Sequence, residues 1–123
     1  MTVELSDMGN GIGLIRFSGQ SATQSFSREF LPQIAKAIDQ GLTHPDYRAL
    51  VLTGEGKFFS AGADINAFAQ AIKEDDAPQL IRDLTGVLHP LLIRMRQSPK
   101  ITIAAINGAC AVSYTHLTLP TKA

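Results

Sequence analysis

The spacing of apolar residues alternates between strand-like and helix-like patterns along the chain. Residues 1–5 and 12–17 are short runs of apolar and β-branched side chains, and an Asn-Gly pair at positions 10 and 11 lies between them. Asn-Gly favours the two-residue turn of a β-hairpin, so these runs predict two paired strands. Residues 49–53 and 101–106 are further apolar runs of strand length, and each predicts a strand.

The segment 25–40 repeats an apolar side chain at every fourth position, as seen at Phe26, Phe30, Ile34 and Ile38. This spacing predicts an amphipathic helix, with Gly41 as its C-cap. Pro32 falls within the early turns of that helix and can shift its start, because proline lacks the N–H that a helix interior needs.

A second long helix is predicted from the apolar residues Leu80, Leu84, Val87, Leu88, Leu91, Leu92 and Met95. Pro90 lies inside this pattern and predicts a kink, and Ser98-Pro99 ends the helix. A shorter helix is expected to begin at Ile65. The resulting order, β-β-α-β-α-β, contains no long linker and no second domain.

Two closely spaced turns of small residues follow the strand at 49–53. Gly54-Glu55-Gly56 forms the first, and Ser60-Ala61-Gly62-Ala63-Asp64 forms the second. Small side chains leave the backbone N–H groups of the second turn accessible, as a site that holds a developing oxyanion requires. Asp64 can cap the helix that begins at Ile65. Ser60 lacks the G-x-S-x-G frame of a serine nucleophile, so it is interpreted as a turn residue.

The sequence FFSAGADI at residues 58–65, after the strand VLTG, resembles the enoyl-CoA hydratase/isomerase (crotonase) family. A second resemblance is PKITIAAING at residues 99–108, which is similar to the family's KP-x-IAA-x-NG strand with Pro and Lys in reverse order. The alternative is an ordinary α/β strand-turn-helix unit. The resemblance implies an α/β fold, a crotonase-like β-β-α spiral that is truncated here before the second half of its core.

The same resemblance implies roles for the second turn. The backbone N–H of Ala63 corresponds to the first oxyanion-hole donor, and the second donor of the family falls near position 113. The segment that wraps the adenine end and thioester of coenzyme A corresponds to Ala61, Ala63, Asp64, Ile65 and Asn66. Lys57 could contact coenzyme A phosphates or could be a solvated turn lysine. Coenzyme A is part of the substrate, so no separate cofactor is expected.

Residues 112–123, VSYTHLTLPTKA, differ from the pattern that precedes them. Val112-Ser113-Tyr114 stands where the family carries a Gly run that opens a buried helix, with catalytic Glu residues beyond it. Residues 112–121 also resemble one translated reading frame of a sequencing-library adapter. We therefore predict that residues 1–111 are the N-terminal part of a crotonase-like domain and that residues 112–123 are a non-native tail. A divergent C-terminus is the alternative.

Composition narrows the classes of partner. The formal net charge is zero, which gives no electrostatic reason to expect binding to nucleic acid or to an anionic membrane. The single Cys110 fits a reducing compartment, and no secretory signal or apolar run long enough to span a bilayer is present. His44 and His89 lack a second ligand at metal-binding spacing. A cytoplasmic location and the absence of a metal are therefore expected.

The resemblance implies that the parent protein acts on an acyl-CoA through a thioester enolate. Hydration of 2-enoyl-CoA is the first expectation. The alternatives are Δ3-Δ2 enoyl-CoA isomerisation and the hydratase part of a multifunctional fatty-acid oxidation (β-oxidation) protein. The general acid and base of relatives lie beyond Asn107-Gly108, so none is expected here, and the chain as written is predicted to be an inactive or unstable fragment. The parent is expected to be a homo-oligomer, a trimer or a pair of trimers.

Overall fold

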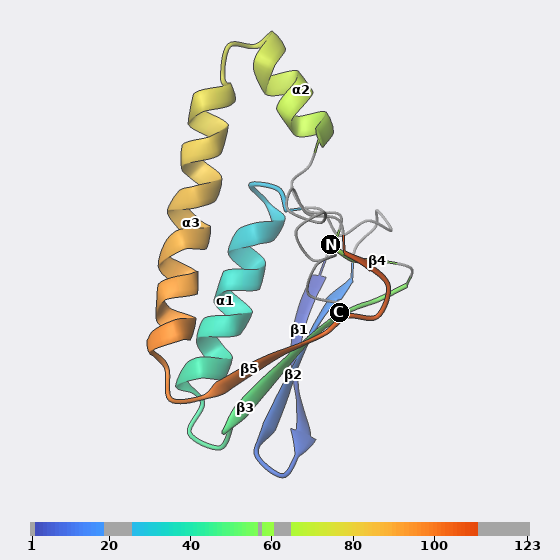
Figure 1. The fold of residues 1–123 in the computed structure, drawn as a ribbon, viewed down its shortest axis with the longest axis vertical. Helices are drawn as coiled ribbons and strands as arrows, with labels where there is room; N and C mark the ends of the chain where they lie inside the picture. The colour runs from blue at the N-terminus through green and yellow to red at the C-terminus, as the bar shows by residue number, and fades with distance from the viewer. Residues whose placement is uncertain (1, 19–25, 57, 61–64, 111–123) are drawn as a thin grey trace, which may run out of the picture.

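The computed structural model describes residues 2–18, 26–56, 58–60 and 65–110. In this part of the chain three helices and six strands follow one another (Figure 1). They are β1 (Thr2–Gly9), β2 (Ile12–Ser18), α1 (Phe30–Thr43), β3 (Ala49–Gly54), β4 (Phe58–Ser60), α2 (Ile65–Lys73), α3 (Ala77–Gln97), β5 (Ile101–Ala105) and β6 (Ala109–Cys110). The predicted order is thus correct in outline. The predicted order did not include β4 and β6. It also counted as one helix the two that were predicted separately, α2 and α3.

β1 and β2 form the predicted antiparallel hairpin. Asn10 and Gly11 both have positive φ angles, 56° and 78°, which is the geometry that Asn-Gly turns supply. β1 extends to Gly9, four residues beyond its predicted end, with an irregularity between Asp7 and Gly9. There the N–H of Gly9 donates to Asp7 Oδ1 at 2.7 Å.

Four strands form the main sheet in the order β1-β2-β3-β5. β3 lies parallel to both β2 and β5, and the pairing aligns Leu14, Val51 and Ile103 across the three strands. A second sheet consists of β4 and β6, which are also parallel. β4 and β6 are three and two residues long, too short to carry a detectable alternation of apolar and polar residues.

Helix α1 begins at Phe30 rather than at residue 25. The side chain of Ser27 sets this start, because its Oγ accepts the N–H of Phe30 at 3.0 Å and its carbonyl accepts the N–H of Leu31. Pro32 is then the third helical residue, where no intrahelical donor is needed. The predicted start was wrong because Ser27 provides the capping oxygen.

The other end of α1 also differs from the prediction. Gly41 lies inside the helix, which continues to Thr43, and His44 is the C-cap residue. Gly41 is glycine because Leu50 of β3 packs against it, since an added Cβ would lie 2.6 Å from Leu50 Cδ2. Lys100 Nζ donates to the carbonyls of Gly41, at 3.1 Å, and of His44, so a positive charge stabilises this end.

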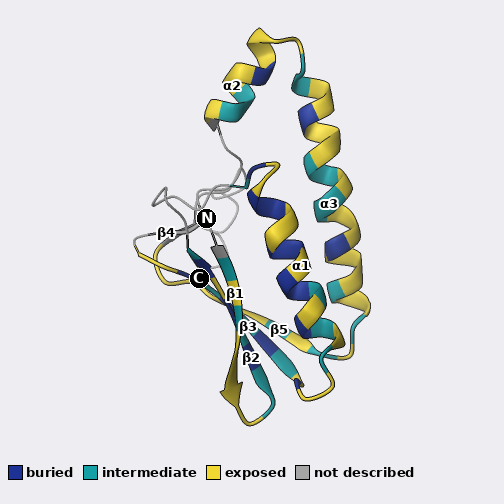
Figure 2. Ribbon diagram, turned by 180° about the vertical axis from the view of Figure 1, so that it is seen from behind, coloured by how far each residue is buried: buried dark blue, intermediate teal, exposed yellow. Residues whose placement is uncertain are grey.

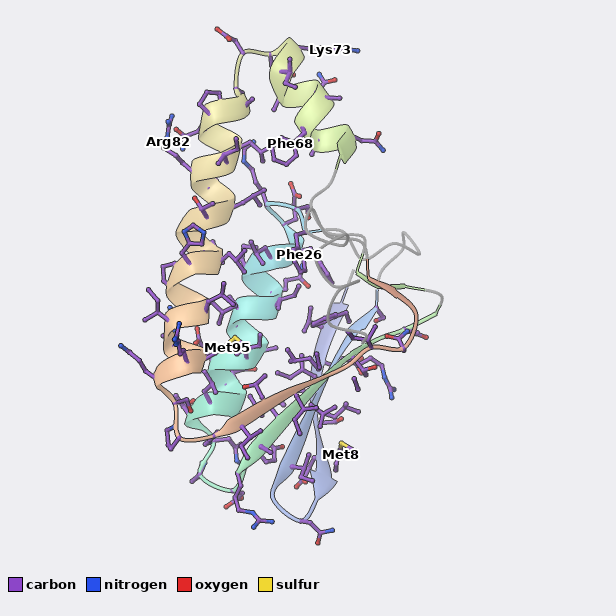
Figure 3. All side chains as sticks on the ribbon, viewed as in Figure 1. Met8, Phe26, Phe68, Lys73, Arg82 and Met95 are labelled. Carbon is purple, nitrogen blue, oxygen red and sulfur yellow. The ribbon has the colours of Figure 1, made fainter. Side chains whose placement is uncertain are left out.

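The core lies between the sheet and α1, and α3 covers the outer side of α1 (Figure 1). Ile15, Phe30 and Leu50 are completely buried, and Phe17 meets Phe30 edge-on with ring centroids 6.2 Å apart. Burial of side chains of this size contributes about 1.5–3 kcal/mol each. Met95 projects from α3 onto α1 (Figure 3).

Helix α3 includes Pro90 and ends at Gln97, with Ser98 as its C-cap, which agrees with the prediction that Ser98-Pro99 ends it. The kink at Pro90 remains a prediction. Arg94 fastens α3 to α1 through two parallel hydrogen bonds to Asp39, at 2.8 and 2.9 Å. None of the helices in the described ranges is long and apolar enough to cross a membrane.

Candidate functional site

The two sequence motifs come together at one edge of the main sheet. β3 contains the VLTG strand that leads into the first motif, β5 contains most of the second motif, and the two strands are parallel neighbours. The carboxyl ends of parallel strands lie at the same edge of a sheet, so Gly54 and Asn107 meet there. In open α/β sheets this edge is the usual place for a ligand.

Asn107 bridges the two motifs directly. Its Oδ1 accepts the N–H of Gly54 at 2.8 Å, and its Nδ2 donates to the carbonyl of Gly56 at 3.0 Å. One side chain therefore holds both ends of the Gly54-Glu55-Gly56 turn. Gly56 has a φ of 86°, which glycine adopts without strain. The role of Asn107 was missed in the sequence, where its only signal was membership of the second motif.

Two further hydrogen bonds fix the surroundings of this turn. Thr53 Oγ1 donates to the carbonyl of Ala105 at 2.9 Å, and the N–H of Glu55 donates to the carbonyl of Phe17 at 2.9 Å. The turn is thus tied to β2 on one side and to β5 on the other.

The segments that follow β3 and β5 also pair with each other, as strands β4 and β6. Their register places Phe58 opposite Ala109 and Ser60 opposite Cys110. Ala63 and position 113, the two expected donors of the oxyanion hole, each follow one of the paired residues Ser60 and Cys110 by three positions.

Most of the predicted site residues lie outside the described residues. These are Lys57, Ala61, Ala63 and Asp64, together with position 113. Their roles, including capping by Asp64, remain predictions. Ile65 begins α2 as predicted, and Asn66 is exposed in its first turn.

Arg28, just before α1, holds the segment that joins α2 to α3. Arg28 Nε donates to Asp83 Oδ2 at 2.9 Å, and Arg28 Nη2 donates to Asp76 Oδ2 at 3.0 Å. The hydrogen bond to Asp76 raises the pKa of Arg28 above its usual value. Partial burial acts in the opposite direction, and the negative charges of Asp76 and Asp83 raise the pKa further. Arg28 thereby links the start of α1 to the α2–α3 turn.

A cavity of about 190 Å³ lies beneath α2. Its walls come from the residues just before α1, from α2 and from the start of α3, and they include Ser27, Arg28, Ala67, Ala71 and Leu80. Ala71 and Leu80 are almost fully buried and join α2 to α3. Phe68 of α2 also points toward α3 (Figure 3).

The histidine nearest to β3 in sequence has a structural role. His44 Nδ1 accepts the N–H of Asp46 at 3.1 Å, and its ring stacks on Tyr47 with centroids 4.1 Å apart. His44 is the C-cap residue of α1, so its ring serves the packing of the segment between α1 and β3. Within the described ranges, no group of three or more His, Cys, Asp and Glu residues has the arrangement of a metal site.

The arrangement matches a known family along nearly the whole chain. The profile of the family described as enoyl-CoA hydratase/isomerase matches residues 7–120. The chain belongs to the enoyl-CoA hydratase/isomerase family. This confirms the resemblance inferred from the two motifs. The match also runs past residue 111, the predicted boundary of the native sequence, and that boundary remains a prediction.

Individual relatives include both hydratases and isomerases. A Thermus thermophilus protein, a candidate enoyl-CoA hydratase, is 38% identical over 93 residues, which cover 76% of this chain and 36% of that protein. The 1,2-epoxyphenylacetyl-CoA isomerase of Escherichia coli is 31% identical over 107 residues, covering 87% of this chain and 40% of the isomerase. The chain therefore spans about two fifths of the length of these relatives.

Solved structures confirm the fold. The crystal structure of enoyl-CoA hydratase from Bacillus halodurans superposes with a TM-score of 0.77 at 20% sequence identity. The superposition covers 88% of this chain and 43% of the hydratase. The α/β crotonase-like architecture, truncated relative to the family members, is thus as predicted.

Proposed function

We propose that the complete protein, meaning a chain that continues past Cys110 with the rest of the family's domain, adds water to 2-enoyl-CoA thioesters. In this proposal the backbone N–H of Ala63 donates to the thioester oxygen. The observation that carries it is the contact of Asn107 with Gly54 and Gly56, because this contact joins the two motifs at one sheet edge. Family membership supports a hydratase or isomerase type of reaction.

The chemistry explains why a rigid backbone is useful here. When water adds to the β-carbon of an enoyl thioester, negative charge develops on the thioester oxygen. A preorganised N–H donor aimed at this charge lowers the barrier by about 3–4 kcal/mol. A carboxylate must also activate the water and move the α-proton. That carboxylate is proposed to come from the part of the domain that this chain does not span.

Recognition of coenzyme A is proposed to use the segment around the start of α2, formed by Ala61, Ala63, Asp64, Ile65 and Asn66. Most of these contacts would be made by backbone groups, so small side chains suit them. Asn66 is exposed in the first turn of α2. Lys57 could add a phosphate contact. The substrate supplies the coenzyme A, and the complete protein is proposed to act in the cytoplasm as a trimer or a pair of trimers.

Isomerisation of a Δ3-enoyl-CoA to the Δ2 isomer is the second candidate. It is favoured by the Escherichia coli relative, which is named as an isomerase of an acyl-CoA and is 31% identical. Both reactions pass through charge on the thioester oxygen, so both use the same donor at Ala63. They differ in the number and position of carboxylates. A hydratase part of a multifunctional fatty-acid oxidation protein would use the same chemistry as the first candidate.

The test supplies the complete protein separately with crotonyl-CoA and with a Δ3-enoyl-CoA. Hydration predicts loss of the conjugated-thioester absorbance from crotonyl-CoA, whereas isomerisation predicts its gain from the Δ3 substrate. Absence of both changes would overturn the proposal. The chain as written is the matched control and should show no turnover above a protein-free sample, because it lacks the proposed carboxylate.

A further inference from the structure

Asparagine is followed by glycine at two places in the chain, Asn10-Gly11 and Asn107-Gly108. In this dipeptide the backbone nitrogen of glycine can attack the side-chain amide of asparagine, because glycine has no Cβ to hinder the approach. This chemistry is one reason why asparagine is a thermolabile residue. The structure gives the two pairs different hydrogen-bonding surroundings, so their reactivity can be compared within one protein.

The first pair forms the turn between β1 and β2. Asn10 is exposed, and Figure 2 shows the end of β1 that leads into the turn in the colour of exposed residues. Within the described ranges no hydrogen bond holds the side chain of Asn10 or the N–H of Gly11. Neither the attacking nitrogen nor the attacked side chain is therefore tied to another group.

Arg48 places a positive charge beside the reacting peptide bond. Its Nη2 donates to the backbone carbonyl of Asn10 at 2.8 Å. This carbonyl belongs to the same peptide bond as the nitrogen of Gly11. When that nitrogen gives up its proton, the negative charge is shared with the carbonyl oxygen, where the guanidinium group stabilises it. Arg48 thus assists the step that makes the nitrogen a nucleophile.

The second pair is held in place by its hydrogen bonds. Asn107 is exposed too, so accessibility to water does not separate it from Asn10. Its Oδ1 accepts the N–H of Gly54 and its Nδ2 donates to the carbonyl of Gly56. Because Nδ2 is the group that leaves as ammonia, the reaction at Asn107 must break the hydrogen bond to Gly56. The bridge between the two motifs therefore opposes the attack.

We propose that Asn10 deamidates spontaneously in the folded protein with the assistance of Arg48, whereas Asn107 is protected by its two hydrogen bonds. In the first step a bond forms between the nitrogen of Gly11 and Cγ of Asn10, and the bond between Cγ and Nδ2 breaks. Nδ2 leaves as ammonia with the proton that Gly11 gives up. Water then opens the resulting succinimide at either carbonyl, which leaves aspartate or isoaspartate at position 10. The proposal does not depend on the proposed reaction.

Isoaspartate at position 10 should loosen the contact between the turn and β3. It adds one carbon to the main chain within a tight turn. The carbonyl of Gly11 accepts the N–H groups of Arg48, at 2.6 Å, and of Ala49, at 3.3 Å. A shift of the turn therefore acts directly on the start of β3.

The turn lies at the opposite end of the sheet from the candidate site (Figure 1). β2 and β3 are parallel, and their register begins with Ile12 opposite Ala49, whereas Gly54 is at the other end of β3. Deamidation at Asn10 should consequently leave the hydrogen bonds of Asn107 in place.

The test incubates the chain as written at mildly alkaline pH, with and without concentrated urea. Mass spectrometry of the peptides follows the replacement of each amide by a carboxylate, and fragmentation distinguishes isoaspartate from aspartate. Without urea we expect modification at Asn10 to be at least roughly tenfold faster than at Asn107, where a local opening must come first. In urea the two rates should become similar. Hydrogen exchange at the amides of Arg48 and Ala49 should be faster in the modified protein.

Two substitutions of Arg48 test the role of its charge. Arg48→Gln can still donate a hydrogen bond to the carbonyl of Asn10, but without the charge it should slow the modification by roughly threefold or more. Arg48→Lys keeps the charge and is the matched control, with a rate close to that of the unmodified chain. Neither change should alter the rate in urea. Circular dichroism checks that both variants are folded.

Three outcomes would overturn the proposal. One is a rate at Asn10 no higher than that at Asn107 in the absence of urea. Another is a difference between the two sites that stays the same in urea, because local sequence and not the fold would then set it. The third is equal slowing by Arg48→Gln and Arg48→Lys, which would exclude assistance by the charge of Arg48.

Discussion

Asn107 Oδ1 accepts the backbone N–H of Gly54 at 2.8 Å, although 53 positions separate the two residues in the chain. The same side chain donates to the carbonyl of Gly56 at 3.0 Å. Asn107 thus supplies both an acceptor and a donor to one turn, because an amide side chain carries both groups. The turn after β3 and the end of β5 consequently behave as one unit.

Replacing Asn107 by Ala should lower the free energy of unfolding by about 1–3 kcal/mol, because the buried N–H of Gly54 loses its acceptor. Asn107→Asp should also destabilise the protein, since a carboxylate can accept from Gly54 but would face the carbonyl of Gly56. Urea unfolding measures both changes. Asn66→Ala on the exposed surface of α2 is the control and should change stability by no more than about 0.5 kcal/mol. Equal stability of Asn107→Ala and the unmodified chain would contradict the importance of the bridge.

Glycine-to-alanine changes at two helical positions should have opposite effects. Alanine in a helix is favoured over glycine by about 1 kcal/mol. At Gly86 of α3 an added Cβ meets nothing within 4 Å, so Gly86→Ala should stabilise by about that amount. At Gly41 the added Cβ would lie 2.6 Å from Leu50 Cδ2, and Leu50 is fully buried. Overpacking costs about 1–3 kcal/mol, so Gly41→Ala should be neutral to destabilising. Thermal unfolding of the two variants tests this difference, and stabilisation of equal size at both sites would contradict it.

The link from Arg28 to Asp76 and Asp83 should hold α2 against the start of α1. Arg28→Ala should increase hydrogen exchange in α2, and the increase should shrink at high salt because these side chains are partly exposed. The pKa of Arg28 is raised. The stabilising contribution of Arg28 is therefore complete at any pH below the pKa of Arg28 in the unfolded chain. It is lost only as the pH rises through the pKa of Arg28 in the folded protein, which is higher still. Across the neutral range the effect of Arg28→Ala should not change through titration of Arg28.

Arg82→Ala is the matched control for the Arg28 experiment. Arg82 points outward from α3 (Figure 3) and donates to Gln79 on the same helix, at 3.0 Å. It should leave exchange in α2 unchanged. If Arg82→Ala and Arg28→Ala increased exchange in α2 equally, the effect would come from the loss of any arginine on this surface.

Sequence periodicity could predict the main elements because their apolar residues are numerous and regularly spaced. The core residues Phe30, Ile34 and Ile38 all belong to the predicted face of α1. The ends of α1 could not be placed in the same way. Its start depends on the oxygen of Ser27, and Gly41, which has the signature of a helix end, is explained by contact with Leu50.

The candidate site could be predicted only in part, for a related reason. A motif identifies the small residues of a turn, but it contains no information on which distant side chain holds that turn. The hydrogen bond between Asn107 and Gly54 depends on β3 and β5 being neighbours, which is a property of the sheet. The short strands β4 and β6 are likewise formed by pairing between distant segments.

The role proposed for Ala63 can be tested in the complete protein by removing its N–H. Ala63→Pro eliminates this donor and fixes φ, so turnover of the enoyl-CoA substrate should fall by at least about two orders of magnitude. Ser60→Ala, three positions earlier, is the control and should change turnover little, because no catalytic role is proposed for its hydroxyl. Circular dichroism must show that both variants are folded, since proline can also disturb the turn. Near-normal turnover in folded Ala63→Pro, together with loss of turnover in Ser60→Ala, would show that the donor is not at Ala63 and would favour a mechanism based on Ser60.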